Sequence, residues 1–218
     1  MTDDLDPTTF PPTRWELVAA DHRGYGAKFA ALVESGEDID GEARLADTLV
    51  SRNATVLDVG AGMGRVGAAL QRRGHRVLAV EKDRALVGQA RATYPDLPVL
   101  ESDLLGLHPA ALIAAGWPAA VDLVVAVGNV MVLLAHDSER RALRTLRQVT
   151  RPGGRLLVGF HPTAGPFGAR DYPPEEFVAD AVAAGWSLDL RAGGYDLVPP
   201  NEQYAVFVLS APSAADPT

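Results

Sequence analysis

The chain has 218 residues, 47% of them apolar and 22% charged, so it can bury a sizeable core as one α/β domain with a small N-terminal addition. Its formal net charge of −8 opposes binding to nucleic acid and to anionic membranes, and no apolar run reaches the roughly 18 residues that span a bilayer. The absence of cysteine excludes disulfides and cysteine-based zinc sites. We therefore predict no metal, nucleic-acid or membrane partner. A cytoplasmic location follows by default, because the acidic, proline-rich N-terminus does not resemble a signal peptide.

The first 52 residues predict helices and no strand. Residues 1–12 combine acidic residues with prolines and predict a mobile arm. Residues 13–52 form an N-terminal helical segment, interrupted by Gly24 and Gly26 and resumed over 40–50 behind the N-cap candidate Asp40. Because these helices precede the first strand, they are placed to cover the mouth of a site.

Five strand and helix units follow, and then a hairpin. Short apolar runs predict strands over 54–59, 75–80, 99–101, 120–127 and 155–160, with helices between them and a turn at 151–154. Residues 163–172 predict a glycine- and proline-rich loop, and 173–185 a helix. Two further strands over 186–191 and 203–210 predict an antiparallel hairpin. Strands that alternate with helices indicate an α/β fold with a mainly parallel sheet.

A glycine-rich turn joins the first strand to its helix. Gly60, Gly62 and Gly64 let a ligand approach the backbone, and free N–H groups of a helix start are expected at this edge of the sheet. Asp58 would repel a pyrophosphate but attract a cationic amino group or sulfonium, which favours S-adenosylmethionine. A frame shifted to Gly62, Gly64 and Gly67 fits a dinucleotide motif, although its first glycine lies too far beyond the strand. An NAD(P)-dependent oxidoreductase therefore remains an alternative.

Polar residues follow the next three strands. Glu81 is placed to accept hydrogen bonds from both ribose hydroxyls of an adenosine cofactor, a feature that NAD enzymes share. Asp103 would face the adenine amino group, or else cap the following helix from an exposed loop. Asn129, next to Gly128, offers a donor and an acceptor beside the glycine turn, or else only shapes its own turn.

The segments VLDVGAGMG, VLAVEKD, ESDL, VDLVVAVGNV and RPGGRLLVGF together resemble the class I S-adenosylmethionine-dependent methyltransferases, and in particular small bacterial members of uncertain substrate. The resemblance extends over roughly residues 53–210. It implies a Rossmann-like, doubly wound, seven-stranded, mostly parallel sheet with an antiparallel last strand, preceded by the N-terminal helices. The methyltransferase domain would then span 53–211, with a frayed tail at 212–218.

The resemblance also implies a cofactor, S-adenosylmethionine, whose product is S-adenosylhomocysteine. Asp58 and the glycines would lie at the methionine portion, Glu81 at the ribose and Asp103 at the adenine. The implied cofactor-binding residues are Asp58, Gly60, Ala61, Gly62, Gly64, Glu81, Lys82, Asp103, Leu104, Gly128, Asn129 and Val130.

Methyl transfer from a sulfonium is an in-line displacement that depends mainly on alignment and on exclusion of water. A base is needed only when the acceptor carries a proton, and His161, directly after the fifth strand, is the best-placed residue, although it also suits a turn before a proline. Residues predicted to contact the substrate are Tyr25, Asn129, His161 and Tyr204. Weaker candidates for the base are His22, Tyr25, Tyr195, Glu202 and Tyr204.

The acceptor is predicted to be a small molecule. The chain lacks the N-P-P-[YF] motif that some family members use to methylate bases and amides, and Asn129-Val130-Met131-Val132 stands in its place. The negative net charge also favours a small-molecule acceptor, because it opposes binding to nucleic acid. A non-catalytic module that binds S-adenosylmethionine or S-adenosylhomocysteine would carry the same motifs and remains an alternative. The sequence does not determine the oligomeric state.

Overall fold

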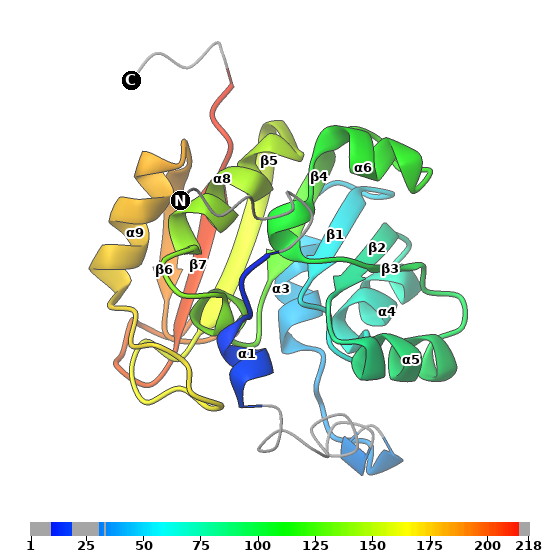
Figure 1. Ribbon diagram of the computed structural model, residues 1–218, viewed down its shortest axis with the longest axis horizontal. Helices are drawn as coiled ribbons and strands as arrows, with labels where there is room; N and C mark the ends of the chain where they lie inside the picture. The colour runs from blue at the N-terminus through cyan, green and yellow to red at the C-terminus, as the bar shows by residue number, and fades with distance from the viewer. Residues whose placement is uncertain (1–9, 19–30, 33, 214–218) are drawn as a thin grey trace, which may run out of the picture.

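The computed structural model describes residues 10–18, 31–32 and 34–213, and one seven-stranded sheet runs through them (Figure 1). The strand order is β3-β2-β1-β4-β5-β7-β6. Strand β7 is antiparallel to both β5 and β6, and the other neighbours are parallel. The predicted fold class is thereby confirmed. The strands are β1 (Thr55–Val59), β2 (Arg76–Glu81), β3 (Val99–Glu101), β4 (Val121–Ala126), β5 (Thr150–Phe160), β6 (Ser187–Ala192) and β7 (Ala205–Ser210).

Helices cover both faces of the sheet. The helices are α1 (Arg14–Leu17), α3 (Gly41–Thr48), α4 (Arg65–Arg72), α5 (Arg84–Thr93), α6 (Pro109–Ala114), α7 (Val130–Leu133), α8 (Glu139–Gln148) and α9 (Pro174–Ala183), with a 3-10 turn η1 (Leu104–Gly106). Helices α3 and α4 pack on one face, and α7, α8 and α9 pack on the other. Within the described ranges, none of these helices has the length and apolar character needed to cross a membrane.

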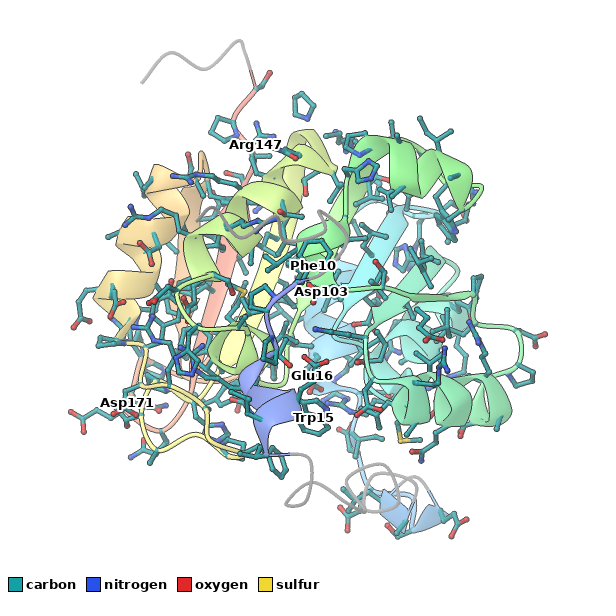
Figure 2. All side chains as sticks on the ribbon, viewed as in Figure 1. Phe10, Trp15, Glu16, Asp103, Arg147 and Asp171 are labelled. Carbon is teal, nitrogen blue, oxygen red and sulfur yellow. The ribbon has the colours of Figure 1, made fainter. Side chains whose placement is uncertain are left out.

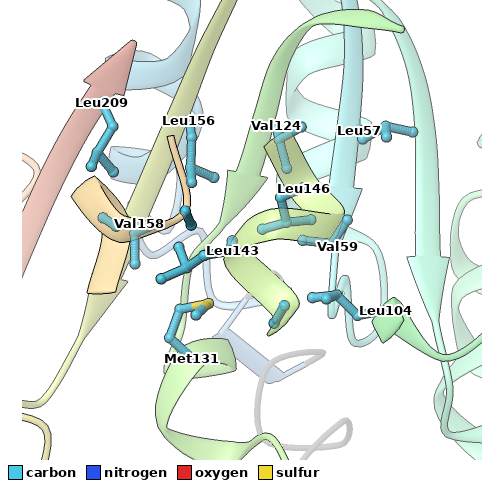
Figure 3. Packing of buried hydrophobic residues seen from close by; sticks show 14 of the residues in the cluster. Leu57, Val59, Leu104, Val124, Met131, Leu143, Leu146, Leu156, Val158 and Leu209 are labelled. Atoms are coloured by element: carbon cyan, nitrogen blue, oxygen red, sulfur yellow. The ribbon is translucent and has the colours of Figure 1, made fainter. Parts of the chain in front are cut away.

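The central strands are buried on both faces because their successive side chains alternate between the two helical layers, whereas the edge strand β6 is largely exposed. In β1, Leu57 and Val59 join the core that includes Leu143 and Leu146 of α8 (Figure 3). Val56 joins the core on the other face, with α3 and α4. Aromatic rings fill the core near α9, where Phe177 lies 4.4 Å from Phe207 and 5.3 Å from Phe160 between ring centroids. This two-sided burial explains why the strands appear in the sequence as apolar runs.

The start of β5 differs from the prediction. Residues 151–154 were expected as a turn, but β5 begins at Thr150. The Gly153 N–H donates to the Ala211 carbonyl at 2.7 Å, and the Ala211 N–H donates to the Gly154 carbonyl at 2.9 Å. Pairing with Ala211, directly after β7, thus keeps this stretch in β5, although its proline and two glycines by themselves favour a turn.

Two short elements were not predicted. Helix α7 follows Asn129, which adopts a left-handed φ of +78°, and η1 follows Asp103. Both are single turns at the carboxyl edge of the sheet, too short to leave a periodic pattern in the sequence.

A leucine pair on neighbouring strands tests the core. Leu209 of β7 is fully buried, and its register partner Leu188 on edge strand β6 is 40% exposed. We expect Leu209→Ala to lower the free energy of unfolding by about 2–5 kcal/mol, because it leaves a cavity. Leu188→Ala, the matched control, should change it by about 1 kcal/mol or less. Urea denaturation of both variants measures the difference, and equal losses would contradict the assignment of the core.

Candidate active site

A pocket opens where β1, β2 and β4 end, at the edge where open α/β sheets bind their ligands. Most of the predicted cofactor-binding residues line it, and apolar side chains of α5, η1 and α7 complete its walls. The predicted residues in the lining are Gly60, Gly62, Glu81, Lys82, Asp103, Leu104, Gly128 and Val130. Topology thus brings together side chains from four separate stretches of the chain.

The glycine turn after β1 forms one wall of the pocket. Gly60, Gly62 and Gly64 all have positive φ, and a Cβ at Gly60 would lie 2.5 Å from a methyl carbon of Val130. The prediction of free N–H groups here is wrong for four positions. Gly60 and Ala61 donate to the Val80 carbonyl, Gly62 donates to Glu81, and Gly64 donates to the Ala61 carbonyl. The turn therefore offers a ligand close approach rather than those four donors.

Asp58 lies beneath this turn and outside the pocket lining. Its side chain is buried, and its Oδ2 accepts a hydrogen bond from the Gly67 N–H of α4 at 2.8 Å. Burial raises the pKa of Asp58 to about 7, partly offset by this hydrogen bond and by the charge of Arg65. In the structure Asp58 ties β1 to the first turn of α4, and its predicted role toward a cationic ligand stays a prediction.

Glu81 connects the ends of two strands. Its Oε1 accepts hydrogen bonds from the N–H groups of Lys82 and Asp83, and its Oε2 accepts one from Gly62, each at 2.8 Å. Burial raises the pKa of Glu81, against the effect of these three donors. An ionised carboxylate has about four acceptor positions. Since three are used, about one remains for a ligand hydroxyl instead of the two that the sequence analysis expected.

Asp103 caps the turn that follows it, which is one of the two roles weighed for it, and its role toward an adenine stays a prediction. Its Oδ1 accepts a hydrogen bond from the Leu105 N–H at 2.8 Å and so caps η1, while the residue also lines the pocket. Its Oδ2 lies 2.9 Å from the Lys82 ammonium, which also contacts Glu16 at 2.7 Å. Lys82 thus joins the carboxylates of Glu16 and Asp103, both of which are labelled in Figure 2.

The sequence analysis named no site residue in α1 or at its N-cap, although it expected this segment, with Trp15, to cover the site. Thr13, Trp15 and Glu16 belong to the N-terminal strap, as we call residues 13–17, and all three line the pocket. The Trp15 indole N–H donates to Asp83 Oδ2 at 2.9 Å. Thr13 and Glu16 form a reciprocal capping box, and this T-x-x-E pattern was the signal in the sequence.

Arg14 anchors the strap on the other side. Its guanidinium is buried, lies 2.9 Å from Glu139 of α8 and donates to the Leu134 carbonyl at 2.8 Å. Thr13 also pairs with Ala135 as an isolated bridge. The expectation that N-terminal residues cover the mouth of the site therefore holds for the strap, while Tyr25 and His22 lie outside the described residues.

A second group of predicted residues gathers beside the pocket, around Asn129. The Asn129 Oδ1 lies 2.9 Å from the His161 backbone nitrogen and 3.0 Å from the ring Nδ1. The His161 ring meets the edge of Tyr204, whose hydroxyl lies 2.9 Å from that of Tyr195. Burial lowers the pKa of His161 and raises that of Tyr204 to about 12. Asn129, His161 and Tyr204 are thus brought together as predicted, but outside the pocket lining.

Metal ligands are not grouped in the part of the chain that the structure describes. There, no three or more His, Asp or Glu side chains lie close enough together to hold a metal ion. Glu202, which the sequence analysis named as a weaker candidate for the base, is exposed.

Comparison with known proteins agrees with this geometry. A family model described as a methyltransferase domain matches residues 56–154. A TehB-like SAM-dependent methyltransferase from Corynebacterium glutamicum is 29% identical, with a TM-score of 0.74 over 87% of this chain and 97% of that one. The fold is that of the α/β methyltransferases. The matched domain and the solved structure to which the chain is similar are a methyltransferase domain and a SAM-dependent methyltransferase.

Curated relatives share only part of their length with the chain. A ribosomal RNA small subunit methyltransferase A from Koribacter versatilis is 32% identical over 44% of this chain and 36% of its own length. A protein-L-isoaspartate O-methyltransferase from Methylorubrum populi is 33% identical over 56% of this chain and 58% of its own length. The names of these relatives point to different acceptors, so the similarity does not define the acceptor.

The raised pKa of Asp58 predicts a pH-dependent difference in stability. Because its folded-state pKa of about 7 exceeds the ordinary 3.8, wild type loses stability as pH rises from 4 to 7. Asp58→Asn cannot ionise and keeps an oxygen that can accept the Gly67 N–H. The free energy of unfolding of Asp58→Asn minus that of wild type should therefore increase by up to roughly 4 kcal/mol between pH 4 and pH 7. Denaturant titrations at several pH values measure it, and a constant difference would contradict the burial of an ionisable carboxyl.

Proposed function

We propose that the protein transfers a methyl group from S-adenosylmethionine to a small-molecule acceptor by in-line displacement. The observation that carries the proposal is the buried Glu81 carboxylate at the junction of β1 and β2. It lines a pocket together with Gly60 and Gly62, which carry no side chains, and it accepts the Gly62 N–H. A nucleoside with an amino-acid arm requires such a hydrogen-bond acceptor beside an unobstructed backbone.

The residues present fit this cofactor. Glu81 retains an acceptor position for a ribose hydroxyl, and Asp103 stands beside Lys82 where an adenine amino group needs an acceptor. Leu104 and Val130 provide apolar walls for a flat ring, and Gly128, beside which there is open space, leaves room for the methionine arm. S-adenosylmethionine supplies, when bound, a methyl group already activated on a sulfonium.

The protein's own contribution is alignment and exclusion of water. The N-terminal strap lies at the pocket and is held from both sides, by Asp83 through Trp15 and by Glu139 through Arg14. A strap fixed in this way can keep solvent from the reacting atoms and hold an acceptor in line with the methyl carbon. His161 is proposed as the base for an acceptor that must lose a proton.

A small-molecule acceptor is supported by charge. The net charge of −8 gives long-range repulsion toward RNA or DNA, whose binding depends on cationic side chains. The cytoplasmic location stays a prediction.

Cofactor binding can be tested with a matched pair of glutamates. We expect S-adenosylhomocysteine to bind wild type with micromolar affinity in calorimetry, and Glu81→Gln to weaken binding by about tenfold or more. The reason is that the hydrogen bond lost involves a charged acceptor. Glu101→Gln is the control, since Glu101 is the register partner of Glu81 on β3 but is exposed and paired with Arg84.

NAD and NADP should give no heat in the same calorimetric experiment. Binding of either nucleotide, or an equal effect of both glutamate substitutions, would contradict the proposed cofactor.

The acceptor class can be tested with a labelled methyl group. Incubation of the protein with labelled S-adenosylmethionine and a fractionated bacterial extract should place the label in the small-molecule fraction. Label in RNA or in protein would contradict the proposed acceptor. Binding of S-adenosylhomocysteine without transfer to any fraction would favour a non-catalytic binding module.

A further inference from the structure

Asn129 connects the pocket to His161. Its chain neighbours Gly128 and Val130 both line the pocket, while its own side chain turns to the end of β5. The left-handed φ of +78° at Asn129 allows this reversal, and its N–H donates to the Gly159 carbonyl at 3.1 Å. The buried amide therefore has a fixed position between the pocket and the imidazole.

The hydrogen bonds of Asn129 define the tautomer of His161. A backbone N–H only donates, so the Asn129 atom 2.9 Å from the His161 backbone nitrogen must be the amide oxygen. That oxygen only accepts, so the ring Nδ1 at 3.0 Å must carry a hydrogen. In a neutral imidazole, Nε2 then holds the lone pair and is the basic atom.

The surroundings keep this imidazole neutral. Tyr204 contacts the ring with its own ring, and burial raises the pKa of Tyr204 and of Tyr195 above the ordinary value, so both remain uncharged at neutral pH. The charged pair beside the two tyrosines, Glu42 of α3 and Arg65 of α4, is joined by a bidentate contact. On the loop that follows His161, the Asp171 carboxylate accepts the Ala164 N–H at 3.0 Å. Burial is the cause that lowers the pKa of His161.

We propose that Asn129 is a positioning residue that holds His161 with Nε2 as proton acceptor, and that the methyl acceptor is a neutral hydroxyl or ring N–H compound. This inference rests on the proposed function. The acceptor's lone pair forms a bond to the methyl carbon, and the carbon–sulfur bond breaks with its electrons left on sulfur. The proton of the acceptor atom passes to His161 Nε2, and the resulting imidazolium releases it to solvent. A carboxylate or a tertiary amine has no such proton and would not need this pair.

Nitrogen-15 spectra of the imidazole side chains test the tautomer without any acceptor. The chain has five histidines, and the resonances missing from His161→Gln identify His161. We expect wild type to show a protonated Nδ1 and an unprotonated Nε2 at neutral pH. A protonated Nε2 would overturn the inference.

Asn129→Asp separates positioning from a merely structural role. Aspartate has nearly the same shape, tolerates a left-handed φ and keeps an oxygen acceptor, but it adds a negative charge about 3.0 Å from Nδ1. This charge stabilises the imidazolium, so the pKa of His161 should rise by about one unit or more, a tenfold change in proton affinity. His108→Asn is the control, because His108 caps α6 and asparagine is a good N-cap. It should leave the His161 titration unchanged, and an unshifted titration in Asn129→Asp would overturn the inference.

Turnover with matched compounds tests the acceptor class. A panel of phenol, hydroxypyridine and benzimidazole against benzoate and dimethylaniline should give S-adenosylhomocysteine only with the first three. On these, His161→Gln should lose about 10²- to 10⁴-fold in kcat with little change in KM. The acid limb of the rate profile should move to higher pH in Asn129→Asp.

Faster turnover of benzoate or dimethylaniline, or full activity of His161→Gln, would overturn the inference. The two proposals fail separately. Loss of S-adenosylhomocysteine binding defeats the proposed function, whereas a protonated Nε2 with binding intact defeats only the role of His161 and Asn129.

Discussion

The site depends on one buried carboxylate. Glu81 accepts the Gly62 N–H after β1 and the Lys82 and Asp83 N–H groups after β2, so it holds the ends of two parallel strands in a fixed relation. A charge removed from water is tolerated only where donors satisfy it, and three backbone donors do so here. The same group therefore shapes the glycine turn and presents its remaining acceptor position to the pocket. The structural role of Glu81 and its proposed role in cofactor binding thus rest on the same atoms.

The pocket is completed by a segment far away in sequence. The N-terminal strap reaches α8 through the buried Arg14–Glu139 pair and reaches β2 through the contacts of Trp15 and Glu16. A buried ion pair pays a desolvation penalty, so its value lies in specifying a position as much as in stability. It holds one short helical turn against the pocket, where Thr13, Trp15 and Glu16 are part of the lining. Part of the pocket lining thus depends on a contact to α8 that neither β1 nor β2 supplies.

The fold and the reaction are determined by different parts of the molecule. The sheet is what the chain shares with the methyltransferases to which it is similar, and its carboxyl edge carries the proposed site for the methyl donor. The proposed acceptor side consists of Asn129, His161 and Tyr204, at the ends of β4 and β5 and next to the start of β7. Because the names of the relatives point to different acceptors, the fold alone does not define the acceptor.

The sequence by itself determined the order of the strands and helices, the glycine turn and the position of Glu81. These features are local: an apolar run, a glycine spacing and a residue at a strand end can be recognised without knowing what lies opposite them. Only the tertiary structure decided that Asp58 caps α4, that the N–H groups of Gly60, Ala61, Gly62 and Gly64 are already bonded, and that Trp15 and Glu16 line the pocket. It also placed the start of β5 at Thr150 and joined Asn129 to His161. Each of these depends on a partner distant in the chain, and local periodicity carries no information about such a partner.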